Sequence, residues 1–226
     1  MNKTLKSKSL IASCLAALSL PAYSATIVVS VQDADTSAPY DLTNVWGTLD
    51  WAYTSEGNTN RKDGGSLIST MPSSLGSAAQ RPGYGFTFAD GESPETGTIT
   101  NPTFANAQSI TVTVAAPSAN PFTIYYWGSV FQATGTLTAT ISGDSATDSA
   151  SYTLAGSTRS PGALFTIVVD PNEMGDIVTL TYVTSDPTAS NPNNSNVALT
   201  AIGVVPEPAT ALLGGLGFLI MLRRRR

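Results

Sequence analysis

Carboxylates and aromatic rings are the side chains in this sequence that could do chemistry. Among its 226 residues there is no histidine, and the single cysteine, Cys14, lies in an N-terminal apolar run. These absences remove the commonest general base, the thiol nucleophile and the usual zinc ligands. Two carboxylates could still hydrolyse a glycosidic bond, but most acids here lie beside Gly, Pro or Ser, where turns favour aspartate. We therefore expect no catalytic residue and a protein that is not an enzyme.

One acidic segment has a spacing that partly fits a calcium loop. Asp170, Asn172 and Asp176 offer oxygen ligands at alternate positions, and Gly175 precedes the last of them. An EF-hand-like loop needs a further oxygen ligand where Met174 stands. The competing interpretation is an acidic hairpin turn between two strands, and we rank it above calcium. No other cofactor is expected.

Aromatic side chains could stack on sugar rings. The candidates are Trp46, Trp51, Tyr125, Tyr126 and Trp127. Neighbouring residues of a strand point to opposite faces, so Tyr126 and Trp127 cannot share one face, and one of them could be exposed. The competing interpretation is that these rings pack in the core, as most aromatic residues in strands do.

The rest of the sequence has the pattern of an all-β domain that would position these residues. Short runs rich in branched, aromatic and threonine residues alternate with turn residues, and no amphipathic helix of three turns precedes residue 209. The predicted strands are 26–31, 45–53, 84–88, 110–114, 122–130, 136–141, 151–154, 164–169, 177–183 and 197–204. They predict a β-sandwich of jelly-roll or Greek-key type. A solenoid is the alternative, but no fixed repeat period supports it. Segments 55–83 and 185–196 are expected to be loops.

The net charge of this domain limits the classes of partner that it can bind. Residues 25–205 contain four basic and fifteen acidic side chains, a net charge of −11. Binding to nucleic acid depends on clustered Lys and Arg, which this segment lacks. We therefore expect no nucleic acid partner and no binding to anionic membrane surfaces.

The first 24 residues have the form of a secretory signal peptide. Three lysines precede an apolar run at 10–20, and the small residues Ala22 and Ser24 follow it. This arrangement predicts cleavage between Ser24 and Ala25. A lipoprotein signal that acylates Cys14 is the alternative, but the apolar run continues beyond that cysteine, whereas a lipobox cysteine should end it.

The C-terminal end combines a proline step, an apolar run and an arginine cluster. Pro206 and Pro208 flank Glu207 in an extended step, because proline lacks the N–H that a helix needs. Residues 209–222 carry no charge, and a helix of that length reaches only about 21 Å, short of a bilayer core of about 30 Å. This short transmembrane helix would stop at four arginines on the cytoplasmic side. They are Arg223, Arg224, Arg225 and Arg226.

This order of features resembles the PEP-CTERM sorting tail, and the resemblance covers residues 205–226 only. It implies recognition by an exosortase, a membrane cysteine protease that cuts near the Pro-Glu-Pro step in bacteria that make exopolysaccharide. An ordinary tail anchor is the alternative. We expect three segments, which are a signal peptide at 1–24, a β-sandwich domain at 25–205 and a sorting tail at 206–226.

The function expected from these signals is that of an exported, non-catalytic cell-surface or extracellular-matrix protein. It would cross the inner membrane, stay there transiently, and reach the cell surface or the medium after C-terminal processing. Its expected partners are the exosortase-type protease and exopolysaccharide in a biofilm. A carbohydrate-binding β-sandwich module is the first alternative, and a secreted glycan-active hydrolase is less favoured.

Overall fold

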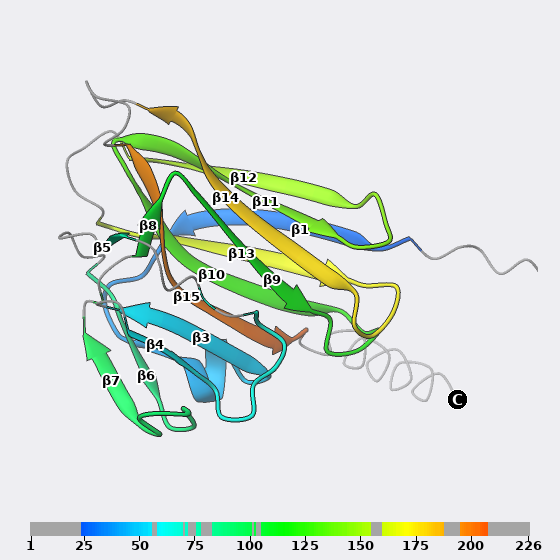
Figure 1. Ribbon diagram of the computed structural model, residues 1–226, viewed down its shortest axis with the longest axis horizontal. Coiled ribbons are helices and arrows are strands. Elements are labelled where there is room, and N and C mark those ends of the chain that lie inside the picture. Colours follow the sequence, from blue (N-terminus) through cyan, green and yellow to red (C-terminus); the bar gives the residue numbers. More distant parts are fainter. Residues whose placement is uncertain are drawn as a thin grey trace, which may run out of the picture.

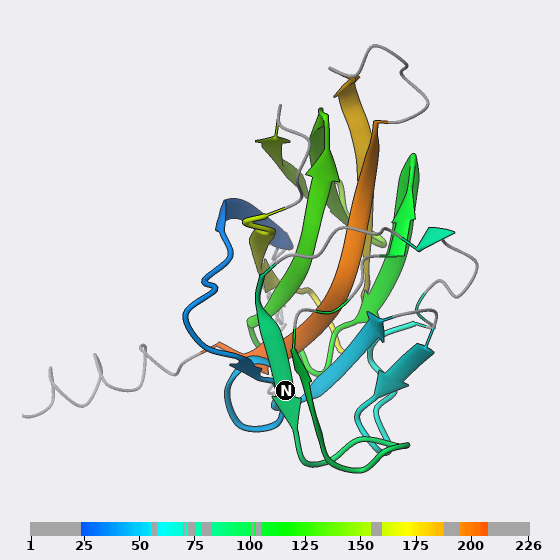
Figure 2. The same cartoon turned by 90° about the vertical axis from the view of Figure 1, so that its left-hand side faces the viewer.

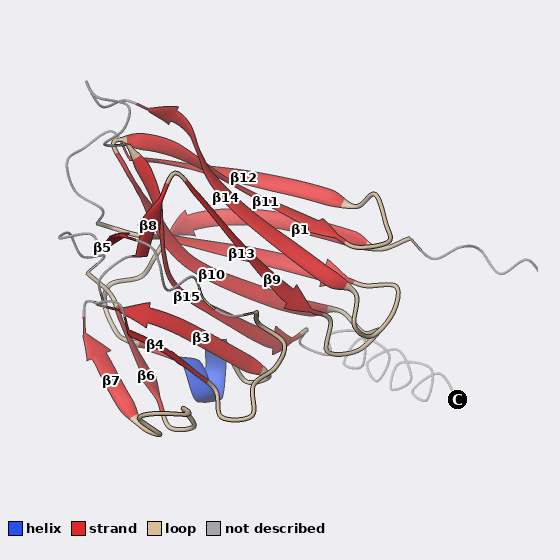
Figure 3. Cartoon of the chain, viewed as in Figure 1, coloured by secondary structure: helices blue, strands red, loops and turns tan. Residues whose placement is uncertain are grey.

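The all-β prediction is confirmed by the computed structural model. It describes residues 24–55, 58–69, 71, 76–77, 83–100, 102, 105–154, 160–187 and 195–207. Within these ranges the chain forms antiparallel sheets, with one parallel pair of strands, and helix is limited to the single turn η1, Leu42–Trp46 (Figure 3). The jelly-roll or Greek-key type stays a prediction.

The largest sheet has eight strands, and one of them is β15, with which the β domain ends. Its order is β1-β13-β10-β15-β3-β4, with β8 paired to β15 and β5 paired to β8 (Figure 1). The strands are β1 (Thr26–Asp33), β13 (Ala163–Asp170), β10 (Phe122–Phe131), β15 (Asn196–Pro206), β3 (Asp50–Ser55), β4 (Asn58–Arg61), β8 (Ala105–Ala107) and β5 (Gly76–Ser77). The last strand of the chain, β15, therefore lies between β10 and β3 in the interior of the sheet, and it is orange in Figure 2.

A second sheet of four strands packs on one face of the large sheet. Its order is β12-β11-β14-β9. The strands are β12 (Thr147–Leu154), β11 (Ala133–Ile141), β14 (Ile177–Pro187) and β9 (Ser109–Ala115). The main core lies between the two sheets, where the fully buried rings of Tyr126, Phe165 and Tyr182 meet at centroid distances of 5.2 to 6.0 Å. Buried and partly exposed residues alternate along β11, which includes the predicted strand 136–141. They alternate because one face of β11 packs against the core and the other faces solvent.

A small third sheet creates a second core on the other face of the large sheet. It contains β2 (Tyr40–Asp41), β6 (Gly85–Phe88) and β7 (Gly97–Thr100), in the order β2-β6-β7. Figure 1 places β6 and β7 beside β3 and β4, far from β12. Phe86, Trp51 and Trp127 are completely buried in this second core. Strand β10 is therefore covered on both faces.

One predicted strand, 45–53, is wrong in its first half. Strand β3 begins only at Asp50, and η1 precedes it. The Asp41 carboxylate caps this turn by accepting hydrogen bonds from the backbone and side-chain nitrogens of Asn44, at 3.0 and 2.9 Å. Local capping of this kind competes with strand pairing, and it leaves Val45 56% exposed instead of in a sheet face.

The two predicted loops also differ from expectation where the structure describes them. The segment 55–83 contains β4, which pairs with β3, and the short strand β5. Strand β14 continues to Pro187, so the second loop begins later than predicted, and most of it, 188–194, lies outside the described residues.

Candidate functional site

The step predicted to be the sorting signal follows the core directly. Val204 and Val205 of β15 are buried, and Pro206 pairs with Phe122 at the start of β10. Glu207 is the next residue, so no spacer separates the interior strand from the Pro-Glu-Pro step. The fold therefore sets where this step leaves the domain.

Glu207 is held against the beginning of β10 by two hydrogen bonds. Its backbone N–H donates to the Pro121 carbonyl at 3.2 Å. Its carboxylate Oε1 accepts from the hydroxyl of Thr123 at 3.3 Å, and Thr123 is only 4% exposed. Nothing in the linear sequence indicated Pro121 or Thr123 as partners, because they lie more than eighty residues earlier in the chain. Glu207 is thus part of the folded surface.

An aromatic pair lies on the same face of β10 as Thr123. Tyr125 and Trp46, which comes from η1, are both half-buried, and their ring centroids lie 4.6 Å apart in an edge-to-face arrangement. Burial raises the pKa of the Tyr125 hydroxyl, and the charge of Glu207 raises it further. The aromatic pair and the sorting acid therefore share one region of the surface.

Three other aromatic residues predicted as stacking surfaces belong to the core. Trp51, Tyr126 and Trp127 are completely buried, so they cannot stack on a sugar in this fold. The hypothesis that Tyr126 or Trp127 could be exposed is wrong, and the competing interpretation, that these rings pack in the core, is correct for all three. The two side chains do point to opposite faces of β10, but Tyr126 enters the main core and Trp127 the second core. Of the five candidates, only Trp46 and Tyr125 keep a partly exposed ring.

The acidic segment 170–176 forms a turn that connects the two large sheets. It joins β13 of the eight-stranded sheet to β14 of the four-stranded sheet, so the predicted hairpin is wrong. Asp176 Oδ2 accepts hydrogen bonds from the backbone N–H groups of Asn172 and Glu173, at 3.0 and 3.1 Å. Within the ranges that the structure describes, no group of three or more His, Cys, Asp or Glu side chains could hold a metal ion. Calcium binding by Asp170, Asn172 and Asp176 stays a prediction.

Asp50, the first residue of β3, carries a fully enclosed carboxylate. Its Oδ2 accepts from the backbone N–H groups of Leu67 and Ile68, at 2.8 and 3.0 Å, and lies 3.7 Å from Nη2 of Arg61. Arg61 Nε is also 3.9 Å from Oε1 of Glu92. One arginine thus lies between two carboxylates.

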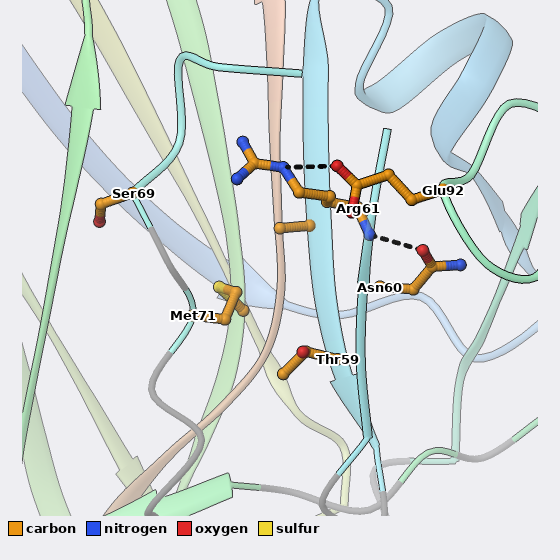
Figure 4. Close-up of a pocket in the computed structure, with 7 residues that line it drawn as sticks. Thr59, Asn60, Arg61, Ser69, Met71 and Glu92 are labelled. Carbon is orange, nitrogen blue, oxygen red and sulfur yellow. Dashed lines mark hydrogen bonds and ion pairs between the residues drawn. The ribbon is translucent and has the colours of Figure 1, made fainter. Parts of the chain in front are cut away.

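Arg61 and Glu92 line a small cavity next to β4. Figure 4 shows the residues around it, and its volume is about 80 Å³. The lining residues are Ala52, Thr59, Asn60, Arg61, Ser69, Met71 and Glu92. Small-molecule pockets usually enclose about 300 to 1,000 Å³, so this cavity is too small for a sugar ring and its neighbours.

Asp90, which follows β6, is the centre of a polar cluster. Its Oδ1 accepts from Trp51 Nε1 at 2.8 Å and from the Thr43 hydroxyl at 2.6 Å, and its Oδ2 pairs with Nζ of Lys62. Burial raises the pKa of Asp90, but the hydrogen bonds from Lys62, Thr43 and Trp51 outweigh it and lower the pKa below its ordinary value. Asp90 therefore fixes the indole of the second core and the turn η1 in place.

Several predicted functional segments lie outside the described residues. They are the signal peptide up to residue 23, Pro208, the apolar run 209–222 and the arginines at 223–226. Within the part of the chain that the structure covers, no helix is long and apolar enough to cross a membrane.

Comparison with known proteins identifies the tail. Residues 204–226 match the family model for the PEP-CTERM protein-sorting motif, which confirms the resemblance drawn from the sequence. Neither the curated proteins nor the solved structures include a match to this chain.

Proposed function

We propose that this protein is a non-catalytic component of the cell surface or extracellular matrix, exported with its signal peptide and released or attached by an exosortase. The sorting motif at 204–226 is the observation that carries this function, because it suggests export and processing by a membrane protease. We also propose that the protein associates with exopolysaccharide in a biofilm.

The path of the chain supports processing close to the membrane. Because β15 is an interior strand that ends at Pro206, and Glu207 is held by Thr123 and Pro121, the step leaves the domain at a fixed place on its surface. If 209–222 lies in the bilayer with the arginines on the cytoplasmic side, the folded domain rests at the outer surface. The protease would then meet Glu207 at the membrane interface, next to the start of β10.

The surface chemistry supports a glycan partner over a nucleic acid or an anionic lipid. The domain carries a net charge of −11 without a basic cluster, which disfavours phosphate-rich partners. The half-buried rings of Trp46 and Tyr125 offer apolar edges at the surface. This pair specifically favours the second candidate function, a carbohydrate-binding module. A glycan hydrolase is less favoured, since Asp50 is completely buried and Arg61 lies between it and Glu92.

The proposal is tested on the full chain in a host that has an exosortase. Glu207→Ala should leave the β domain folded but retain the protein in the membrane fraction, whereas the control Glu95→Ala should be released like the natural protein. Mass spectrometry of the released protein should find neither residues 1–24 nor the arginine cluster. Peptides containing Met1 or Arg226 in the extracellular fraction, or unchanged release of Glu207→Ala, would contradict the proposal.

A further inference from the structure

The start of β1 is attached to a carboxylate from the opposite sheet. The backbone nitrogen of Ala25 lies 2.9 Å from Oδ2 of Asp144, and the Ser24 hydroxyl lies 3.3 Å from the same oxygen. Ala25 is only 3% exposed, whereas Ser24 is exposed. Asp144 lies in the turn between β11 and β12, 119 residues away in the chain. The bond predicted for signal-peptide cleavage, Ser24–Ala25, is therefore next to this carboxylate.

The turn holds Asp144 in position for this contact. Its Oδ1 accepts from the backbone N–H groups of Ser145 and Ala146, at 2.6 and 3.2 Å. Its Oδ2 accepts from Nδ2 of Asn172 at 3.1 Å, as well as from Ala25. The hydrogen bond from Ala25 is the largest of the effects that lower the pKa of Asp144. The carboxylate is therefore charged and oriented at neutral pH.

Cleavage would change the chemistry of this contact. Hydrolysis of the Ser24–Ala25 peptide bond consumes one water, leaves a carboxylate on Ser24 and gives Ala25 a free α-amino group, which is protonated at neutral pH. The neutral N–H donor then becomes an ammonium with three donors. Hydrogen bonds between ionised partners are shorter and stronger than those of neutral groups.

We propose that Asp144 is the binding site of the mature N-terminus, so that removal of the signal peptide creates an ion pair between the Ala25 α-ammonium and Asp144. The inference rests on the proposed export of the protein. Among the strands that the structure describes, β1 lies at one edge of the large sheet and pairs with β13 alone. The ion pair joins the start of β1 to the β11–β12 turn of the other sheet. Processing therefore strengthens the contact between the two sheets at this edge.

The contact also distinguishes between cleavage bonds. A cut one residue earlier would leave the Ala25 nitrogen as a neutral amide, and a cut one residue later would remove Ala25. Cleavage of the Ser24–Ala25 bond places the ammonium on the nitrogen that already lies 2.9 Å from Oδ2 of Asp144.

A second contact along β1 provides a matched control. The backbone N–H of Val29 donates to Oδ2 of Asp148 at 2.7 Å, which also joins β1 to the four-stranded sheet. This donor remains an amide before and after processing. The two aspartates therefore make similar contacts with β1, but only Asp144 gains a charged partner.

The first measurement is a double-mutant cycle on the exported, processed protein expressed from the full chain. One form has the natural N-terminus, and the other carries a Gly-Ser insertion between Ser24 and Ala25, which moves the amine away from Asp144. In the natural form Asp144→Asn should raise the unfolding equilibrium constant about twofold to fivefold more than in the insertion form. Asp148→Asn should have the same effect in both forms.

The second measurement is the pKa of the Ala25 α-amino group, obtained from the pH dependence of amine labelling. We expect it above the ordinary range of about 7.7 to 8.0 and lower in Asp144→Asn. Among the residues that the structure describes, the other ionisable groups on the elements packed around this end of β1 are carboxylates, and they act on the α-amino pKa in the same direction. They are Asp148, Asp170, Glu173 and Asp176. The stabilisation should be complete below the unfolded pKa and lost as the pH rises through the folded value.

The outcomes separate this inference from the proposed export. An exported protein that begins at Ala25 but has an ordinary α-amino pKa and no coupling to Asp144 would overturn the inference alone. A protein that is not exported would overturn the proposed function. An exported protein that begins at another residue would keep the function and overturn the ion pair.

Discussion

Thr123 donates a hydrogen bond to the carboxylate of Glu207 at 3.3 Å, so the second residue of β10 holds the acid of the sorting motif. The backbone N–H of Glu207 is held as well, by the carbonyl of Pro121. A protease that binds Glu207 must first displace these two hydrogen bonds. We therefore expect the folded domain to affect how readily the motif is presented.

The hydroxyl of Thr123 should slow processing. Thr123→Val keeps the shape of the side chain but removes the donor to Glu207, so we expect the tail to be processed up to about fivefold faster. The cost in the free energy of unfolding should be about 1 kcal/mol. Pulse-chase analysis of the precursor measures the rate, and Thr181→Val, on the outer face of β14, is the control. Equal rates in both variants would contradict a role for Thr123.

Any glycan binding should depend on the aromatic pair at the surface. Trp46→Ala and Tyr125→Ala should each weaken binding on a glycan array, because they remove the rings that remain partly exposed. Val45→Ala, which alters an exposed neighbour, should have no effect. Retention of full glycan affinity in both aromatic variants would exclude this pair as the binding site.

Trp127→Ala should act on stability instead of binding. This indole is completely buried against Phe86 and Tyr40, at centroid distances of 5.4 and 5.1 Å. Its removal should lower the free energy of unfolding by about 3 to 5 kcal/mol, because it leaves a large cavity in the second core. Denaturant unfolding measures this loss, and a change below about 1 kcal/mol would show that the second core does not stabilise the domain.

Asp90 should make the domain sensitive to acid. Its pKa is lower in the folded protein than the ordinary value of about 3.9, so its stabilisation is complete above that value and is lost as the pH falls through the folded pKa. Asp90→Asn should lower stability at pH 7 by about 1 to 2 kcal/mol and flatten the acid dependence. Thermal unfolding between pH 2 and 7 tests this, with the exposed Glu95→Gln as control. An acid dependence as steep in Asp90→Asn as in the natural protein would be inconsistent with it.

The segment 170–176 should behave as a turn and not as a calcium site. Since the Asp176 carboxylate accepts two backbone N–H groups, we expect chelation with EDTA to leave the unfolding temperature unchanged. Asp176→Asn should lower that temperature equally with and without calcium. A rise in the unfolding temperature with added calcium, abolished in Asp176→Asn, would instead establish the metal site.

The sequence determined the signals that are read along the chain. Processing signals are short segments defined by the order of their side chains, so a cleavage step at Ser24–Ala25 and a sorting step at Pro206–Pro208 can be predicted without the fold. Alternation along a strand is similarly local: β11 was predictable because every second residue of it faces the core. The same reasoning predicted a strand for residues 45–49, and this was wrong because the Asp41 cap favours a helical turn there.

Only the tertiary structure decided which surfaces are covered and which distant residues meet. That Tyr126 and Trp127 face opposite sides of β10 follows from strand geometry. Their burial depends on the layers packed there, which are the four-stranded sheet over Tyr126 and the layer of η1, β2, β6 and β7 over Trp127. The contacts of Glu207 with Thr123 and of Ala25 with Asp144 likewise depend on strand order. The first pair is separated by 84 positions in the sequence and the second by 119. Sheet pairing and layer packing bring such residues together, and local propensity and periodicity do not encode either.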